Sequence, residues 1–511
     1  MSHKEILEDF EKRKQKALGM GGPEKLAKRS EQGIMNARER IDYLLDQGTF
    51  LESGLFATSI RPELREKSPC DGKIAGYGKV NGREVAFVVN DFTVLGASSS
   101  TTNLKKMKHM KKVAAERGIP LILLGESTGS RMPDRMGSQG RATMAQDPYE
   151  YRRLRESPWV SALLGPCYGS STWYTALSDF AVMRKGATMA VASSRVTSIA
   201  INQPVDPEEL GGWRLHTETT GLVDIAVDTD EEAIDVIKKY LGYLPGHANE
   251  APPEYPVPEG SGEDAEKILD ILPESRNAVY DVRNIIKCIV DKNSLFELKP
   301  RFGKSIVTAF ARLDGKSIGI IANNPQFLAG SIDTDAMRKA TSFLVQCDSY
   351  NIPLVFMVDQ PGFLIGIAGE RQGAPGKIMN WCNAISLVTV PKMVVIMRKD
   401  YGQAYLNMGG GQNSHEVILW PSAELSFMDP SVGVNILHGI REEDDPERFK
   451  QLRDEIARGT SAYELAAYYE GHNIIDPRET RPVLIRTLEI YRKGKNKGVG
   501  EHLLRNWPTS Y

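Results

Sequence analysis

Cysteine and histidine are scarce in this chain, which has five cysteines and eight histidines among 511 residues. No Cys-X-X-Cys pair occurs, so we expect neither a disulfide framework nor a thiolate zinc site. His-Glu-X-X-His and other close histidine clusters are also missing, which leaves a metal hydrolase with little support. The composition suits a reducing compartment, and no metal site is expected.

A large net charge and long apolar runs are missing as well. The 64 lysines and arginines nearly balance the 66 aspartates and glutamates, which gives no general electrostatic reason to bind nucleic acid. No segment approaches the roughly 20 apolar residues of a membrane span. The charged N-terminus lacks the apolar core of a signal peptide and is too acidic for a transit peptide. We therefore expect a cytoplasmic protein without a membrane span.

Length and composition indicate two large domains. Hydrophobic residues make up 41% of the chain, and a single core stops growing at roughly 250–300 residues. Proline, glycine and acidic residues interrupt every periodic pattern near residues 247–267, which is typical of a linker. We expect domains at residues 1–250 and 264–511, joined by a linker at 251–263, with a charged helical tail in the second domain.

The two halves of the chain contain a repeat. Gly82 aligns with Gly315 at an offset of 315 − 82 = 233. The same offset also aligns Asn90 with Asn323, Ser98 with Ser331, Gly129 with Gly362, and Tyr168-Gly169 with Tyr401-Gly402. Long-period similarity of this kind is typical of repeated structural units. We interpret the chain as one domain that has been duplicated.

Each copy has the same predicted order of elements. A hairpin turn at Asn81-Gly82 or Asp314-Gly315 joins two β-branched runs, and a helix follows. Two strands then come in turn, each ending in a glycine loop. We expect helices at 102–117 and 335–350, strands at 121–124, 162–164, 354–358 and 392–397, and loops at 125–131, 165–171, 359–364 and 398–404. The alternation indicates an α/β fold with a mainly parallel, buried sheet.

One nucleophile motif occurs, Gly125-Glu-Ser-Thr-Gly129, directly after a predicted strand. In a serine hydrolase Ser127 would be the nucleophile, and His216, His247 and His415 are available as bases. The repeat argues against this interpretation, because Ser127 aligns with Gln360 and the loop recurs without the nucleophile. A hydrolase stays a minor alternative. A dinucleotide site is unsupported, because no Gly-X-Gly-X-X-Gly follows a strand at a helix start.

Both halves share a pair of glycine loops, with Gly129 and Gly169 in the first half and Gly362 and Gly402 in the second. Glycine lets backbone N–H groups approach a ligand closely. Two such groups from separate loops can form an oxyanion hole, which holds the negative oxygen of an enolate or tetrahedral intermediate. The sequence therefore predicts two oxyanion holes. The alternative is that these glycines only permit tight turns.

Motifs along the whole chain match one protein family in the same order. They are Ala37-Arg-Glu-Arg-Ile41, Asp91-Phe-Thr-Val94, Gly165-Pro-Cys167, Ser178-Asp-Phe180, Glu208-Glu-Leu-Gly-Gly212, Asn351-Ile-Pro-Leu354, Pro361-Gly-Phe363, Val390-Pro-Lys392, Arg398-Lys-Asp-Tyr-Gly402, Trp420-Pro-Ser-Ala-Glu424 and Asp476-Pro-Arg-Glu-Thr-Arg481. The chain thus resembles the carboxyltransferase subunit of biotin-dependent acyl-CoA carboxylases of the propionyl-CoA carboxylase β type. The family includes the α subunits of biotin-dependent acyl-CoA decarboxylases. The resemblance implies two crotonase-type ββα superhelix domains and a hexamer, with active sites between the first half of one copy and the second half of another.

The resemblance also implies the site residues. Two oxyanion holes would replace a side-chain base, because the oxyanion of biotin itself removes the α-proton of the thioester. The catalytic residues would be Gly129, Ser130, Gly169 and Ser170 on the acyl-CoA side, and Gly362, Phe363, Gly402 and Gln403 on the biotin side. The expected substrate-binding residues are Arg131, Ser171, Trp173, Leu364, Ala404 and Leu406.

Two departures from the family pattern bear on activity. The common Gly-Gly-Ala of both second loops is replaced here by Gly169-Ser-Ser171 and Gly402-Gln-Ala404. The acyl-selecting aspartate is replaced by Leu406, which favours a larger or more apolar acyl group. Ser170 and Gln403 therefore suggest either an unusual substrate or an altered activity.

We expect a carboxyltransferase that moves a carboxyl group between biotin on a separate carrier protein and an acyl-CoA. No Ala-Met-Lys-Met biotinyl site and no nucleotide-grasp signature occur, so biotin carboxylase and biotin carrier protein subunits are the expected partners of a homo-hexamer. One alternative is a biotin-dependent acyl-CoA decarboxylase subunit, which runs the reaction in reverse. Another is a non-catalytic scaffold of a carboxylase complex, suggested by Ser170 and Gln403.

Overall fold

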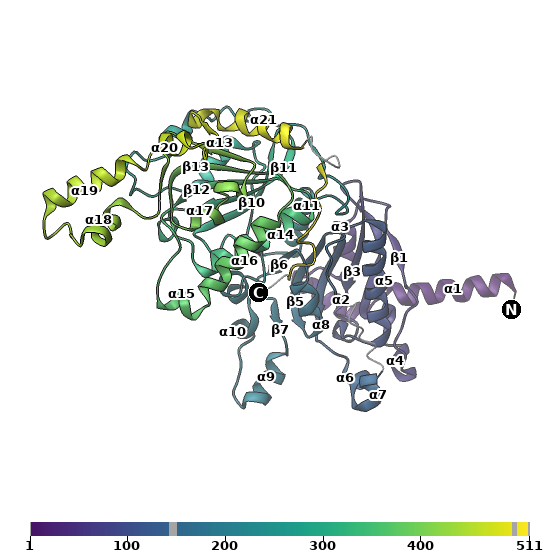
Figure 1. Cartoon of the computed structure of the whole chain (residues 1–511). Helices are drawn as coiled ribbons and strands as arrows, with labels where there is room; N and C mark the ends of the chain where they lie inside the picture. The colour runs from purple at the N-terminus through teal and green to yellow at the C-terminus, as the bar shows by residue number, and fades with distance from the viewer. Residues whose placement is uncertain (1, 143–150, 493–497, 509–511) are drawn as a thin grey trace. The chain divides into compact units, whose positions relative to one another are not determined.

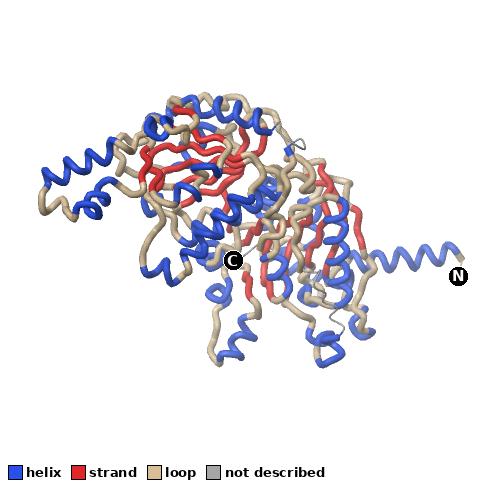
Figure 2. The backbone as a smooth tube through the Cα atoms, viewed as in Figure 1, coloured by secondary structure: helices blue, strands red, loops and turns tan. Residues whose placement is uncertain are grey.

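The computed structural model describes residues 2–142, 151–492 and 498–508. The chain divides into two compact units, the first reaching Ala248 and the second running from Asn249 to Trp507 (Figure 1). Figure 2 shows the strands of each unit in red, with helices packed around them. Each unit therefore has a sheet and a core of its own.

The described part of the first unit contains a mixed sheet of eight strands. They are β1 (Leu51–Ser53), β2 (Lys73–Val80), β3 (Arg83–Asn90), β4 (Leu121–Ser127), β5 (Trp159–Tyr168), β6 (Phe180–Arg184), β7 (Thr188–Ala190) and β8 (Ile225–Val227). Their order is β1-β2-β3-β4-β5-β6-β8, and β7 pairs with the end of β5. β1, β2 and β3 pair antiparallel, and every pair from β3 onward is parallel. The central strands are apolar along almost their whole length because helices cover both faces of a parallel sheet.

The described part of the first unit also contains eleven α-helices, some of which pack against this sheet. They are α1 (His3–Leu18), α2 (Pro23–Glu31), α3 (Ala37–Leu44), α4 (Pro62–Arg65), α5 (Thr101–Arg117), α6 (Met132–Arg135), α7 (Gly137–Ala142), α8 (Ser170–Ala176), α9 (Ser194–Ile201), α10 (Pro207–Gly211) and α11 (Asp230–Leu241). α5 begins at a capping box formed by Ser100 and Asn103 and ends at the left-handed Gly118. It contacts β2 and β3, whereas α11 contacts α3, β5 and β6.

The sheet of the second unit repeats that of the first. Its strands in the described residues are β9 (Phe296–Leu298), β10 (Ile306–Leu313), β11 (Lys316–Asn323), β12 (Leu354–Gln360), β13 (Lys392–Tyr401), β14 (Glu416–Leu419), β15 (Glu424–Ser426) and β16 (Asn473–Ile474). The order is β9-β10-β11-β12-β13-β14-β16, with β15 paired to β13. The predicted α/β fold and its duplication are confirmed.

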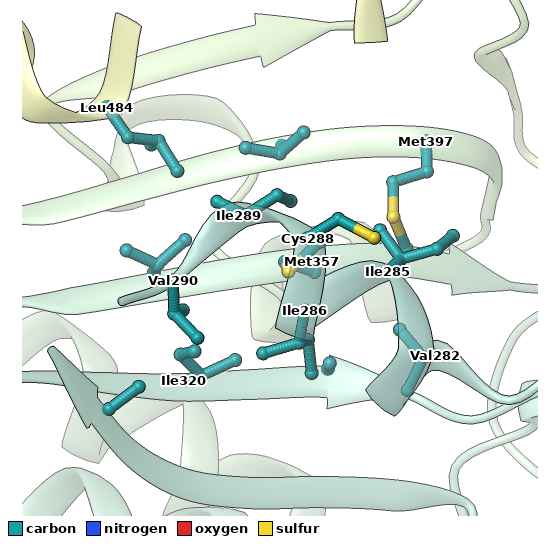
Figure 3. Packing of buried hydrophobic residues seen from close by; sticks show 14 of the residues in the cluster. Val282, Ile285, Ile286, Cys288, Ile289, Val290, Ile320, Met357, Met397 and Leu484 are labelled. Carbon is teal, nitrogen blue, oxygen red and sulfur yellow. The ribbon is translucent and has the colours of Figure 1, made fainter. Parts of the chain in front are cut away.

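Helices of the second unit come before, between and after its strands. They are α12 (Lys267–Ile271), α13 (Val282–Ile289), α14 (Thr334–Ser349), α15 (Ile367–Arg371), α16 (Ala374–Leu387), α17 (Ala404–Asn407), α18 (Pro430–His438), α19 (Pro446–Arg458), α20 (Ala462–Ala467) and α21 (Thr480–Arg492). Figure 3 shows how α13 packs on the sheet: Val282, Ile285, Ile286 and Ile289 lie against Ile320, Met357 and Met397, with Leu484 of α21 beside them. Burial of these side chains stabilises the unit by about 1.5–3 kcal/mol each.

The two predicted hairpin turns form as expected, and each is held by an aspartate. Asn81-Gly82 and Asp314-Gly315 all have positive φ between 51° and 78°, as a two-residue type I′ turn requires. Asp46 accepts hydrogen bonds from both N–H groups of the first turn, at 3.0 and 2.7 Å. Asp291 does the same in the second turn, at 3.1 and 2.7 Å. The duplication thus includes the side chain that caps the turn.

Two buried lysines also occupy equivalent places in the units. Lys106 lies on α5 and Lys339 on α14, 339 − 106 = 233 residues apart. Lys106 Nζ donates to the carbonyl of Lys73, and Lys339 Nζ donates to the equivalent carbonyl of Ile306 at 2.7 Å. Burial lowers the pKa of Lys339 to about 7. Each lysine therefore ties the long helix to the first strand of its hairpin.

The strands that carry the glycine loops are longer than the sequence predicted. β4 extends to Ser127 and β12 to Gln360, whereas we expected them to end at residues 124 and 358. β5 and β13 extend likewise to Tyr168 and Tyr401. Pairing between neighbouring strands continues past the expected ends, across a register shift before Ser127 and before Gln360. The loops are consequently shorter and start immediately before their glycines.

Two segments outside the repeat have distinct environments. The predicted linker at 251–263 belongs to the second unit, where Tyr255 N donates to Gly315 O at 2.9 Å and Arg312 stacks on the Tyr255 ring. The charged tail forms α19, which packs on α18 through a small cluster containing Val434, Phe449 and Leu452. The other side chains of α19 are partly or fully exposed.

Candidate active site

The two glycine loops of the first unit lie side by side. Gly129 follows β4 and Gly169 follows β5, and these strands are parallel neighbours. A Cβ placed on Gly169 would lie 3.7 Å from the Cα of Gly129. Both glycines have positive φ, 94° and 64°, and Gly169 has ψ of −127°, which side-chain-bearing residues essentially never adopt. Glycine is therefore required at this contact.

Unpaired N–H groups gather at this pair of loops. Gly129 N donates to Ser127 Oγ at 3.1 Å. The backbone N–H groups of Ser130, Gly169 and Ser170 have no acceptor within the described part of the chain. Since buried or half-buried N–H groups are normally paired, these donors are suited to an oxygen of a ligand.

The second unit repeats this arrangement with two differences, because its first glycine N–H is unpaired and its second is paired. Gly362 and Gly402 have φ of 125° and 70°. Gly402 N donates to Ser426 O at 3.0 Å. The N–H groups of Gly362, Phe363 and Gln403 have no acceptor among residues that the structure describes. Each unit thus presents three unpaired backbone donors at its two loops.

Ser170 and Gln403, which replace glycine of the family pattern, differ in their surroundings. The Ser170 hydroxyl lies 2.9 Å from that of Ser99, so its side chain turns toward the loop after β3. The Gln403 side chain is exposed. Neither side chain accepts a hydrogen bond from the loop donors in the described structure. The backbone donors consequently stay accessible in spite of both departures.

A small cavity of about 30 Å³ with a mainly apolar lining lies beside Ser170 and Ser171, and its volume is enough for one water molecule. Lys73 and Asn90 line it, and Lys73 Nζ donates to Asn90 Oδ1 at 3.0 Å. Burial lowers the pKa of Lys73 to about 8. The cavity therefore places an ionisable group behind the first-unit loops.

Arg131, predicted to bind substrate, is buried with 4% of its surface exposed. Its guanidinium contacts Asp71 Oδ1 at 2.6 Å and Ser98 O at 3.2 Å. Its N–H donates to Ser99 O at 2.9 Å. The structure thus gives Arg131 contacts that fix the Gly129 loop to the loop after β3.

The other predicted substrate-binding residues lie near the loops of their units. Trp173 on α8 is 40% exposed and forms an edge-to-face contact with Tyr151. In the second unit, Ala404 is buried and Leu406 half-buried on α17, whereas Leu364 is 44% exposed. Trp173 and Leu364 therefore offer apolar surface close to the unpaired donors.

The hydrolase alternative is not supported by the surroundings of Ser127. Its side chain is fully buried, and its hydroxyl donates to Ala97 O at 3.2 Å while it accepts from Gly129 N. Both ring nitrogens of His216 contact other atoms, namely Thr220 Oγ1 and Met189 O. Because a nucleophile must be exposed and paired with a base, Ser127 has a structural role in holding the loop.

A basic cleft of about 540 Å³ lies in the first unit, and its residues were not among the predicted site residues. Lys25, Lys28, Arg29 and Arg184 line it, together with the carboxylate of Glu126. Arg29 and the fully buried Arg40 both contact this carboxylate at 2.5 Å. Burial favours a higher pKa for Glu126, but the two guanidinium groups lower it overall. The cleft therefore carries net positive charge, which no local sequence pattern indicated because its residues come from separate segments.

A second missed feature is the buried pair Asp400 and Gln360 next to the second-unit loops. Gln360 Nε2 donates to Asp400 Oδ1 at 2.5 Å. The repeat offset could have drawn attention to it, since these residues align with Cys167 and Ser127, which carry no carboxylate or amide.

Comparison with known proteins decides the family. The family model described as carboxyl transferase domain matches residues 28–502. The chain belongs to this family. It is 35% identical to the carboxyltransferase subunit of propionyl-CoA carboxylase from Haloferax mediterranei, over 97% of this chain and 98% of that one. It is also 32% identical to the α subunit of methylmalonyl-CoA decarboxylase from Propionigenium modestum, with 96% of both chains covered.

A solved structure matches this carboxyltransferase equally fully. The transcarboxylase 12S hexamer, with methylmalonyl-CoA and methylmalonic acid bound, aligns with a TM-score of 0.90 at 31% identity and covers 97% of each chain. This match confirms the predicted duplicated crotonase-like fold. The chain is an enzyme of the biotin-dependent acyl-CoA carboxylase family and acts as a carboxyltransferase.

The described residues contain no group of three or more His, Cys, Asp or Glu side chains that could hold a metal ion. Within the same residues, every helix is too short or too polar to cross a membrane.

Proposed function

We propose that this carboxyltransferase moves a carboxyl group between carboxybiotin on a separate carrier protein and an acyl-CoA, through two sets of backbone donors. The observation that carries the proposal is the recurrence of unpaired N–H groups at equivalent loops of both units. A single pair of loops would serve one oxyanion. Two pairs suit a reaction in which the thioester and the biotin ring each develop negative charge on oxygen.

The backbone donors of the two units stabilise two different oxygens in this proposal. Ser130, Gly169 and Ser170 hold the thioester oxygen as it gains negative charge, and Gly362, Phe363 and Gln403 hold the ureido oxygen. Carboxybiotin supplies the carboxyl group and, after its release, the base. Fixed N–H donors lower the cost of charge because they need no reorientation during the reaction. No side-chain base is required, which agrees with the buried, bonded state of Ser127.

The basic cleft supports acyl-CoA as the substrate of the first unit. A CoA thioester carries phosphate groups on its nucleotide end, and these are attracted to Lys25, Lys28 and Arg184. The cleft shares the Glu126–Thr128 segment with the strand and loop that lead to Gly129. One CoA thioester can therefore place its nucleotide in the cleft and its thioester group at the Gly129 loop. The exposed Trp173 can then contact the acyl chain.

Apolar Leu406 supports acyl groups larger or more apolar than propionyl. It occupies the position that selects the acyl group in the family and packs near Gly411, where an added Cβ would lie 3.3 Å from its side chain. Acyl-CoA selectivity is therefore expected to favour a longer chain.

A second candidate is the reverse reaction, decarboxylation of an acyl-CoA onto biotin. The similarity to the methylmalonyl-CoA decarboxylase α subunit favours it. Both directions use the same donors, so the partner proteins and the supply of energy would determine direction. The scaffold alternative has less support, because Ser170 turns its hydroxyl to Ser99 and leaves the donors free.

Partners and assembly are proposed from the relatives. The biotin carrier and biotin carboxylase would be separate subunits, and the assembly would be a hexamer, as in transcarboxylase 12S. In this proposal the first unit of one copy works with the second unit of another copy.

The decisive experiment measures carboxyl transfer directly. The purified chain is incubated with a carboxylated, isotope-labelled biotin carrier and a panel of acyl-CoAs from acetyl to long-chain and branched acyl groups. Label is expected in at least one acyl-CoA, with preference for apolar acyl groups. Transfer to no acyl-CoA, together with intact binding of the carrier, would favour the scaffold and overturn the proposal.

Substitution of Gln403 tests the biotin-side loop in the same assay. Gln403→Gly is expected to change the transfer rate because it alters the conformational freedom of a donor residue. Arg441→Gly, on the exposed segment before α19, is the matched control and should leave the rate unchanged. An unaltered rate in Gln403→Gly would remove that loop from the reacting centre.

A further inference from the structure

Asp400 and Gln360 are buried together at the base of the second-unit glycine loops. Their exposed fractions are 1% and 0%. Each precedes a loop glycine by two residues, Gly402 and Gly362 respectively. Besides its bond to Asp400, Gln360 Nε2 donates to Tyr401 O at 3.1 Å. The amide thus bridges β12 and β13 at the point where both strands lead into the donor loops.

One oxygen of each side chain has no partner. Asp400 Oδ2 and Gln360 Oε1 are buried acceptors without a hydrogen-bond donor in the described part of the chain. Burying these two oxygens without hydrogen-bond donors costs free energy of folding. A single proton on Asp400 would relieve both, because the resulting O–H can donate to Gln360 Oε1 while Gln360 Nε2 donates to Asp400 Oδ1.

The charged groups around Asp400 do not stabilise its carboxylate. Asp359 on β12 is the neighbouring charge, and Arg398 and Lys399 contact Asp359 at 2.8 and 3.3 Å. Tyr405 on α17 is the other titratable group that faces Asp400. Burial, with Asp359 adding to it, raises the pKa of Asp400 to about 7 in spite of the bond from Gln360.

The equivalent pair in the first unit carries no carboxylate. At the offset of 233, Asp400 aligns with Cys167 and Gln360 with Ser127. Both donate to backbone carbonyls, Cys167 to Gly125 O at 3.3 Å and Ser127 to Ala97 O at 3.2 Å. The fold therefore supports its loops at this position with uncharged donors in the first unit.

We propose that Asp400 and Gln360 share one proton and act as a neutral pair that positions the glycine loops of the second unit. The protonated pair holds the Tyr401 carbonyl, and with it the peptide that leads to Gly402 and Gln403. Release of the proton to solvent leaves a carboxylate oxygen facing the Gln360 carbonyl oxygen. The two oxygens repel each other, and this repulsion weakens the hydrogen bond from Gln360 Nε2 to Tyr401 O. The catalytic part of this inference rests on the proposed function, whereas the shared proton does not.

Infrared spectroscopy tests the shared proton without any substrate. The full-length chain at pH 6 is expected to show a carbonyl-stretch band of a protonated carboxylic acid that is absent from Asp400→Asn and fades in the wild type at pH 9. Asp335→Asn, which removes a carboxylate on the surface of α14, is the matched control and should leave the band in place. An identical spectrum for wild type and Asp400→Asn at pH 6 would show that Asp400 is ionised and overturn the proposal.

The positioning role is tested by the pH profile of carboxyl transfer. The wild-type rate is expected to decline as pH rises through about 7, because the ionised pair holds the loop less well. Asp400→Asn mimics the neutral acid and should remove this decline, whereas Asp400→Leu should lose about tenfold or more in rate at every pH, because both hydrogen bonds with Gln360 are lost. A decline that persists in Asp400→Asn would reject the role. If no acyl-CoA is carboxylated, the proposed function fails while the infrared result still decides the shared proton.

Discussion

At the scale of single residues, Gly169 and Ser170 separate backbone from side-chain contributions to the site. They are adjacent in sequence, but only Gly169 has a conformation reserved for glycine. The Ser170 side chain is bonded to Ser99 and contributes its backbone N–H alone. The chemistry of this loop therefore depends on where the peptide points and little on which side chain follows the glycine.

Gly169→Ala should reduce the carboxyl-transfer rate by about 10²-fold or more, because the strained backbone rotates and the oxyanion donors move away. Ser170→Ala is the matched control, since it keeps the backbone N–H. It should cost about 1 kcal/mol of stability and change the rate by less than about threefold. Steady-state kinetics with urea unfolding of both variants distinguish the effects. Equal rates for the two variants would contradict a role for this donor loop.

Residue patterns predicted the glycine loops because their backbone conformation itself requires glycine, whereas the catalytic role of these loops stays a prediction. Glycine at 129, 169, 362 and 402 was informative because positive φ has few other occupants. Ser99 lies 71 positions from Ser170, and no local pattern links them. Asp400 and Gln360 come from different strands, so their contact depends on the register between β12 and β13. Single-sequence reasoning does not determine that register.

At the scale of elements, the hairpin turns show how a duplicated contact acquires different importance. Asp46 and Asp291 cap equivalent turns through the same two bonds. Asp291 is 1% exposed and also accepts from Arg481 Nη2 at 2.6 Å, whereas Asp46 is half-buried. The turn of the second unit therefore depends on a buried ion pair that its counterpart lacks.

Asp291→Ala should destabilise the protein more than Asp46→Ala. Loss of Asp291 leaves a buried guanidinium without its carboxylate, which costs about 3–5 kcal/mol. Loss of Asp46 removes hydrogen bonds at a half-buried turn, for about 1–2 kcal/mol. Urea unfolding followed by hydrogen exchange of the two hairpins measures both. Similar losses for the two variants would show that Arg481 adds nothing to the turn.

Helices were predicted well where the helical pattern of hydrophobic residues and the capping residue indicate the same boundary. The helices at 102–117 and 335–350 were correct to within one residue, because each begins after a capping side chain. The strand ends were wrong by two to four residues. Gly125 and Gly165 look like loop residues in sequence, yet pairing with a neighbouring strand keeps them in β4 and β5.

At the scale of the whole molecule, the proposal divides one reaction between two units of common origin. The first unit would handle the thioester and the second the biotin ring. A defect in either unit should therefore stop transfer. The duplication also makes each unit an internal reference for the other, as the uncharged counterparts of Asp400 and Gln360 illustrate.

Mixing two inactive variants tests whether a site combines different copies of the chain. Gly169→Ala damages the first unit and Gly402→Ala the second. If the first unit of one copy works with the second unit of another, refolding an equal mixture should restore about a quarter of wild-type activity, because half of the sites receive an intact first unit and half of those also receive an intact second unit. If each site belongs to a single copy, the mixture stays inactive. Variants mixed without refolding serve as the control.

The Asp46 cap also affects how the protein ages chemically. Asparagine followed by glycine loses its side-chain amide when the glycine nitrogen attacks it, and a flexible turn allows that attack. At Asn81-Gly82 this nitrogen donates to Asp46 Oδ2 at 2.7 Å within a fixed turn. Because the carboxylate and the fixed turn hold this nitrogen in place, we expect Asn81 to lose its amide more slowly in the folded protein than in the unfolded chain. In the second unit Asp314 occupies the same turn position and has no amide to lose.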